Sequence, residues 1–555
     1  MTKTIHTAYV IGIDYGSDSA RAIVVDAASG AILSRGVAYY PRWKRGLYQH
    51  PAQAIFRQHP QDYLDALEEC VRTALAPLSE AQIAHIVGIG IDTTGSTPAP
   101  VDRLGVPLAL KPEFQDCEDA MFHLWKDHCA QAEAEELDTL FRTGGTRDYT
   151  VHQGKYSAEW FWAKILRTVR NNADIRREAW TWIEHCDWMI GLLTGNTDPE
   201  HMYHSACAAG HKALWHSDWN GLPEDAVLEQ ADPYLCLVKA RYGRPPEPAM
   251  TRAGSLCPEW ARRLGLKEGI AVSGSSFDAH AGAVGAGIRP GTMVCTIGTS
   301  AVDMVVAKAE ALEGEDLRRF GGKAENSILP GYIGIETGQA AFGDIFAWYK
   351  RLLMWPVQQA KAYLPPEMGE AMSAELEDNM LRLLETEARK RDGADFPVAL
   401  DWFNGRRYPD TDDLQRAAIS GLSLGTDAVD LYRGIIFGAV SGLRRIVSGF
   451  LKAGIKIDDL IAVGGISQKS DYIMQLIADM VGMKLSILDA DQTCAIGAAM
   501  YAAVAAGVYG DADEAAEKMA ARKVRTFCPD QRRKAAYEAQ YQNYLQLAET
   551  QTETK

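Results

Sequence analysis

The chain contains one order of elements twice, and this repeat limits its fold more than any other feature of the sequence. The order is a strand–turn–strand hairpin, a later strand that ends in glycine, and a helix rich in Gly and Ala. The segments are 9–26, 86–96 and 277–288 in the first half, and 291–308, 459–470 and 493–508 in the second. Few residues match between the copies, so the order of elements indicates a duplication with a period of about half the chain.

The repeat predicts two domains with mixed α/β structure. A chain of 555 residues is too long for one ordinary hydrophobic core. Pro290 and Gly291 would end the helix at 277–288 before the second hairpin begins. We therefore expect an N-terminal domain over 8–288 and a C-terminal domain over 291–545.

Charge and cysteine content narrow the class of protein. There are 57 Lys and Arg residues against 73 Asp and Glu residues, a net charge of −16, which disfavours binding to nucleic acid or to acidic membranes. The ten cysteines are scattered without zinc-ligand spacing, as is typical of a reducing compartment. The first residues lack the apolar core of a signal peptide, and no stretch reaches the length of a membrane span. We expect a cytoplasmic protein.

The turn after Asp14 excludes two common nucleotide-binding motifs. A dinucleotide fingerprint needs GxGxxG between a strand and a helix, whereas this turn leads into another strand. A P-loop needs a glycine before its lysine, which "GGISQKS" at 464–470 lacks. A hairpin turn can still bind phosphate, because Gly16 and Ser17 leave backbone N–H groups accessible. Asp14 could then hold Mg²⁺ through water, although the turn read by itself is equally a plain tight turn.

Asp278 follows a strand and opens a helix, which allows two interpretations. It could cap the helix, a common role for aspartate. It could also be a general base that takes a proton from a hydroxyl group at a domain cleft. The two roles are compatible, because a helix N-terminus favours an ionised carboxylate.

Taken together, these residues resemble the FGGY carbohydrate kinases over about 8–545. The resemblance is greatest to the bacterial members that phosphorylate L-ribulose. It rests on "FRQHPQDY", "GIDTTGSTPAPVD", "LWKDH", "YSAEWFWAKIL", "AGHKALWH", "GSLCPEWARRLGL", "ETGQAAFGDIFAWY", "DWFNGRR" and "AVGGISQKS", which occur in this order along the chain.

The resemblance implies two actin-like domains of the ribonuclease H type around a deep cleft. It places ATP mainly on the C-terminal domain and the sugar mainly on the N-terminal one. Asp278 is then the catalytic base and Asp14 the residue that attends Mg²⁺. The nucleotide contacts would include Gly16, Ser17, Gly298, Thr299, Ser300, Gly464 and Gly465, and the sugar contacts Ser96, Lys212, Asp278 and Glu336.

Four places in the chain, six positions in all, depart from patterns found elsewhere in the family. Xylulokinase-like members have Gln-Met-His where this chain has Ser96, Thr97 and Pro98. Cys129 stands at the arginine of a W-x-D-x-R segment, Glu159 at the lysine before Trp160, and Phe437 at an acidic residue. These departures weaken an assignment to xylulose or glycerol.

The implied activity is transfer of the ATP γ-phosphoryl group to L-ribulose, and D-ribulose remains an alternative acceptor. The product would be ribulose 5-phosphate, made in L-arabinose degradation, and the resemblance is compatible with a homodimer. A kinase for another pentulose or a pentitol is a second interpretation. A third is an actin- or Hsp70-like nucleotide switch that binds a protein partner.

Overall fold

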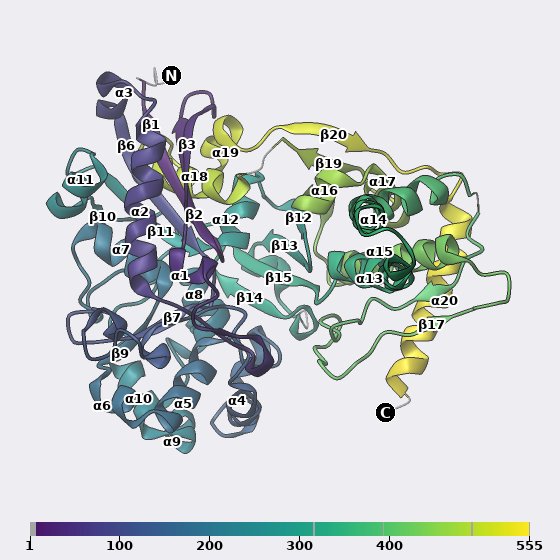
Figure 1. Cartoon of the computed structure of the whole chain (residues 1–555). Helices are drawn as coiled ribbons and strands as arrows, with labels where there is room; N and C mark the ends of the chain where they lie inside the picture. Colours follow the sequence, from purple (N-terminus) through teal and green to yellow (C-terminus); the bar gives the residue numbers. More distant parts are fainter. Residues whose placement is uncertain (1–6, 315–316, 392, 490–491, 554–555) are drawn as a thin grey trace.

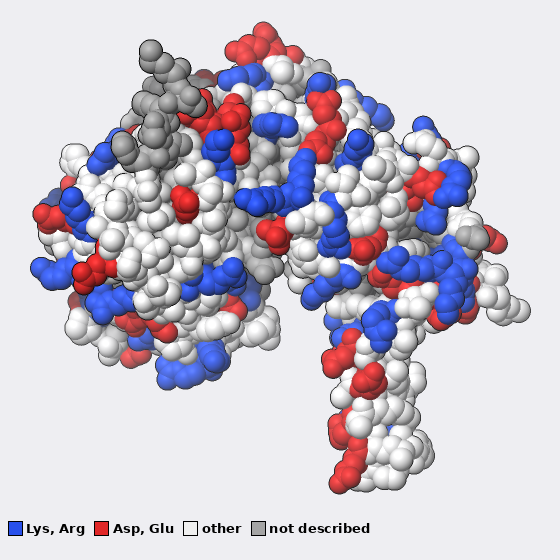
Figure 2. All heavy atoms as spheres, turned by 90° about the horizontal axis from the view of Figure 1, so that it is seen from above, with Lys and Arg blue, Asp and Glu red and all other residues white. Residues whose placement is uncertain are grey.

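The computed structural model describes residues 7–314, 317–391, 393–489 and 492–553. The chain forms two lobes side by side, each built on one large sheet (Figure 1). Seen from above, Lys and Arg side chains lie among Asp and Glu over much of both lobes, and Asp and Glu line one edge of the projection at the lower right (Figure 2).

The first sheet has six strands in the order β10-β11-β6-β1-β2-β3. Strands β1, β2 and β3 form the expected antiparallel meander, and β6 and β11 add to β1 in parallel. The bounds are β1 Tyr9–Tyr15, β2 Ser19–Asp26, β3 Ile32–Tyr39, β6 Ile86–Thr93, β10 Arg252–Ser255 and β11 Ala271–Phe277.

The second sheet has seven strands in the order β14-β15-β13-β12-β18-β19-β20. Its bounds are β12 Gly291–Ile297, β13 Ala301–Ala307, β14 Gly322–Glu325, β15 Ile333–Gln339, β18 Ile457–Val463, β19 Leu485–Leu488 and β20 Lys523–Phe527. Strands β15-β13-β12-β18-β19 repeat the order and directions of β3-β2-β1-β6-β11. The predicted duplication is therefore confirmed at the level of strand order.

Two helices join the lobes. Helix α12 (Asp278–Gly285) follows the first sheet and α18 (Thr493–Ala505) follows β19 of the second, yet α18 packs against β1 and β6 of the first sheet. One apolar core combines side chains of both helices with Val10 of β1 and Val294 of β12. The contact is close, since a Cβ atom on Gly497 would lie 1.9 Å from the carbonyl oxygen of Ala281. Contacts between the halves therefore cross the boundary that the sequence suggests.

Helices cover the outer faces of both sheets. Helices α2 (Pro60–Leu75) and α7 (His185–Thr194) pack on the first sheet. Helices α15 (Ala428–Lys452), α17 (Asp471–Val481) and α20 (Lys534–Glu553) pack on the second. Among the described residues α15 alone is long and apolar enough to cross a membrane, and most of it is buried in this core, as a core helix would be.

Candidate active site

Three carboxyl groups gather where strands of the first sheet end. Asp14 lies near the end of β1 and pairs in register with Asp92 on the parallel strand β6. Asp278 is the first residue of α12, whose cap is Phe277, so the N-cap interpretation is wrong by one position. The Asp278 carboxylate accepts a hydrogen bond from the N–H of Ala279 at 2.7 Å, which fixes its direction at the helix start.

Burial raises the pKa of all three groups, and repulsion by neighbouring carboxylates adds to this effect for Asp92 and Asp278. Burial, together with the Asp14 charge, raises the pKa of Asp278 to about 7. The pKa of Asp92 rises well above its usual value through burial and the charges of Asp14 and Asp278. Burial also raises the pKa of Asp14, against the effect of the Arg21 guanidinium 3.1 Å away. A carboxyl group with a pKa near 7 is suited to accept a proton at neutral pH.

The first hairpin turn leaves a short stretch of backbone beside Asp14. The N–H of Gly16 donates to the carbonyl of Ser19 at 3.0 Å, which closes the turn. The Ser17 hydroxyl accepts from the indole of Trp125 at 2.9 Å, and the Ser17 carbonyl accepts from Gln58 at 2.6 Å. The turn predicted to contact phosphate is therefore held by side chains from two other segments.

A cleft of about 410 Å³ lies between the lobes. Lys212 of α8 (Ala206–Ala213) and Glu336 of β15 face each other in it, with Nζ and Oε1 3.7 Å apart. Burial would raise the pKa of Glu336, but Lys212 and His280 lower it to about 2. Since burial lowers the pKa of His280 to about 4, that ring is neutral at pH 7. The cleft therefore contains a Lys212–Glu336 ion pair, whose charged groups are suited to hydrogen bonds with hydroxyl groups.

Ser96 is buried and is held by two charged residues of the first lobe. Its hydroxyl donates to Glu184, at the end of β9 (Thr181–Glu184), and the N–H of Thr97 donates to the same carboxylate at 2.7 Å. Lys164 of α5 (Phe161–Asn171) donates to the Ser96 carbonyl at 2.7 Å and to the Leu124 carbonyl at 2.9 Å. Burial lowers the pKa of Lys164 and raises that of Glu184.

Of the three turns predicted to bind nucleotide, two lie next to each other in the second lobe. The turn Gly298-Thr299-Ser300 joins β12 to β13, and Gly464 and Gly465 follow β18, which pairs with β12. Gly464 has φ +95°, and a Cβ there would lie 2.6 Å from the Ile297 carbonyl oxygen, so only glycine fits. Thr299 accepts backbone hydrogen bonds from Phe342 and Asp344 at the start of α13 (Gly343–Ala360).

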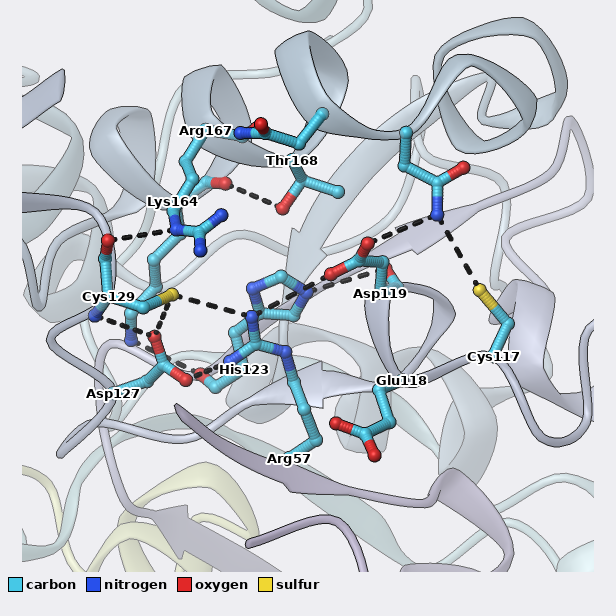
Figure 3. Close-up of polar contacts among 12 residues, drawn as sticks. Arg57, Cys117, Glu118, Asp119, His123, Asp127, Cys129, Lys164, Arg167 and Thr168 are labelled. Carbon is cyan, nitrogen blue, oxygen red and sulfur yellow. Dashed lines mark hydrogen bonds and ion pairs between the residues drawn. The ribbon is translucent and has the colours of Figure 1, made fainter. Parts of the chain in front are cut away.

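Cys129, Glu159 and Phe437, three of the positions that depart from family patterns, have distinct surroundings. Cys129 donates to Asp127 at 2.9 Å, and Arg57 from a different segment pairs with the same carboxylate, as Figure 3 shows. A guanidinium therefore lies beside Asp127 although position 129 lacks one. Glu159 pairs with His128 at 3.0 Å. Phe437 is buried in the core of the second lobe against Phe396 and Tyr537.

Asp92, Glu184 and Lys164 are the polar residues that reading the sequence missed. The duplication could have predicted the place of Asp92. This residue lies at the end of β6, the strand that corresponds to β18, and a duplicated sheet places β6 beside β1. No sequence feature indicated Glu184 or Lys164, because they lie 88 and 68 residues from Ser96 along the chain.

The structure has two lobes of one topology, a polar cleft between them, and a carboxyl group with a pKa near 7. These features are typical of a class of phosphotransferase in which a base activates a hydroxyl acceptor. Family models agree: residues 9–285 match the N-terminal domain and 293–506 the C-terminal domain of the FGGY family of carbohydrate kinases. The chain belongs to this family and is an ATP-dependent sugar kinase.

Known relatives cover the chain from end to end. It is 40% identical to a ribulokinase of Vibrio parahaemolyticus over 99% of this chain and 97% of the relative. It is 35% identical to a ribulokinase of Shouchella clausii over 97% and 94%.

Solved structures share the fold. A xylulose kinase of Rhodospirillum rubrum superposes with TM-score 0.77 at 19% identity, covering 98% of both chains. A Plasmodium falciparum glycerol kinase with ADP gives 0.76 at 15% identity, covering 97% of this chain and 98% of that one. The expected class of two actin-like domains is confirmed.

Proposed function

We propose that this kinase transfers the γ-phosphoryl group of ATP to the 5-hydroxyl of L-ribulose, forming ribulose 5-phosphate for L-arabinose degradation in the cytoplasm. The choice of sugar rests on the 40% identity with a ribulokinase over 99% of the chain. The cleft chemistry supports it, because Lys212 and Glu336 offer a donor and an acceptor to a polyhydroxyl substrate.

Asp278 is the base in the proposed reaction. Its carboxylate takes the proton of the sugar hydroxyl as the oxygen forms its bond to phosphorus and ADP leaves. The Ala279 N–H holds one carboxylate oxygen in place, and the other is available for the hydroxyl. A positioned base of this kind contributes about 10²–10⁴-fold to the rate.

The remaining groups bind the two substrates. Ser96, Lys212 and Glu336 orient the sugar, while the turns at Gly16-Ser17, Gly298–Ser300 and Gly464-Gly465 let ATP approach the backbone closely. The N–H groups of Gly16 and Gly298 close their own turns, so the N–H groups offered to phosphate come from the other residues of these turns. Asp14 would hold Mg²⁺, which fits because carboxylate oxygens are its preferred protein ligands and a second carboxyl group lies next to Asp14. When bound, Mg²⁺ neutralises charge on the phosphates.

A panel of acceptors tests the proposal. ADP release is measured with L-ribulose, D-ribulose, D-xylulose, ribitol, L-arabinitol, glycerol and no acceptor. We expect the highest kcat/KM with L-ribulose and little ADP release without sugar. A higher kcat/KM with another pentulose, a pentitol or glycerol would refute the substrate. ATP turnover that ignores all acceptors would instead favour an actin- or Hsp70-like switch.

A further inference from the structure

The Asp92 carboxyl group has no part in the reaction as proposed. Its surroundings do not offset the cost of burying its charge. It is 0% exposed, and neither of its oxygens accepts a hydrogen bond from the described residues. Burying a carboxylate without donors is costly, so buried charges are normally paired or bind a metal. The fold must therefore offer Asp92 either a proton or a cation.

The sheet places Asp92 directly beside Asp14. The two residues are opposite each other on the parallel strands β1 and β6. Residues two apart on a strand share a face, so Asp14 points to the side of Gly12 and Asp92 to the side of Gly90. Both glycines lie against α18, at Ala495 and Ala498. The two carboxyl groups are close enough on this face for each to affect the pKa of the other.

Positive charge near this pair is scarce. Arg21 bonds to Asp14 at 3.1 Å, but its side chain is 36% exposed and no contact joins it to an oxygen of Asp92. Asp278 adds a third carboxyl group, whose charge raises the pKa of Asp92 and whose own pKa is raised by the Asp14 charge. Two carboxylate oxygens side by side with one guanidinium at the edge form an environment suited to a small divalent cation.

We propose that Asp92 is a second protein ligand of the divalent cation that accompanies ATP, so that Asp14 and Asp92 hold the cation together. This inference rests on the proposed function, which supplies the nucleotide and its metal. It explains why a carboxyl group stands at a fully buried position. The competing explanation is a proton shared between the two carboxyl groups, with the metal bound by Asp14 alone.

The test is the affinity of the enzyme–ADP complex for Mn²⁺, read from the electron paramagnetic resonance signal of free Mn²⁺. Asp92→Asn keeps the shape of the side chain and removes a buried charge. We expect it to weaken Mn²⁺ binding about tenfold or more, since even indirect contacts to a metal are worth 10–100-fold. Asp303→Asn is the matched control, because Asp303 is equally buried on β13 opposite Cys295. It should change the affinity less than about twofold.

The outcomes separate this inference from the proposed function. Mn²⁺ affinity in Asp92→Asn equal to that of the parent would overturn the role of Asp92 and leave the kinase proposal standing. Failure of the parent enzyme with ADP to bind Mn²⁺ would refute both. If the variant does not fold, a crystal structure of the parent with ADP and Mn²⁺ decides: we expect anomalous density bonded to both carboxylates, and bonding to Asp14 alone would overturn the inference.

Discussion

Gly497→Ala should loosen the junction of α12 and α18 and lower both stability and turnover. The added Cβ would lie 1.9 Å from the carbonyl oxygen of Ala281 and 3.1 Å from its Cα. Because both atoms belong to the backbone, no change of rotamer relieves the clash, and the helices must separate by about 1 Å to restore ordinary contact.

The size of the effect follows from two opposing contributions. Overpacking of a tight contact costs about 3 kcal/mol at the upper end of its usual range. Replacing glycine by alanine inside a helix stabilises that helix by about 1 kcal/mol. We therefore expect a net loss of about 2 kcal/mol. Because α12 begins with Asp278, a shift of about 1 Å there should also reduce kcat by about 10²-fold.

The assay compares thermal unfolding and steady-state turnover of this variant with those of Gly369→Ala. Gly369 lies in α14 (Pro366–Ala388), and its nearest neighbour would be 3.4 Å from an added Cβ, which is ordinary contact. The control should keep its activity and gain slightly in stability. A Gly497→Ala enzyme with the parent's melting temperature and kcat would refute the reasoning.

Three further predictions follow from charged groups. Because the base must be ionised and the pKa of Asp278 is about 7, kcat/KM for the sugar should fall tenfold for each pH unit below about 6.5; a flat profile down to pH 5 would contradict this. Burial raises the pKa of Asp303 to about 7, from about 4 in unfolded chains. The folded state therefore binds the Asp303 proton more tightly than the unfolded state. The contribution of this group to folding stability is complete below about pH 4 and is lost as the pH rises through about 7. Asp303→Asn should therefore melt higher than the parent at pH 9 and similarly at pH 4, and a lower melting temperature at pH 9 would be inconsistent with it. Glu184→Gln places an amide donor against the Ser96 hydroxyl or the Thr97 N–H, so KM for the sugar should rise about tenfold while KM for ATP stays within twofold; equal changes in both would show a general loss of structure instead.

The sequence was most informative where local chemistry determines local structure. The hairpins around Asp14 and Gly298 were visible because small turn residues interrupt apolar runs. The start of the helix at Asp278 was correct to one residue.

Features that depend on distant parts of the chain were not readable. Its Gly- and Ala-rich composition predicts the helix at 493–508 but does not say which sheet it covers, and it covers the sheet of the other half. Cys129 suggested that a guanidinium was missing, whereas Arg57 supplies one from 72 residues away. The partners of Ser96 were hidden for the same reason, because nothing near it in sequence indicates Glu184 or Lys164.

The most direct test of the mechanism is the turnover of Asp278→Asn with L-ribulose at saturating ATP, measured together with its dissociation constant for ADP. The amide cannot take the hydroxyl proton, so kcat should fall by about 10²–10⁴-fold while ADP binds within a few-fold of the parent. Turnover at the parent's rate would show that Asp278 is not the base.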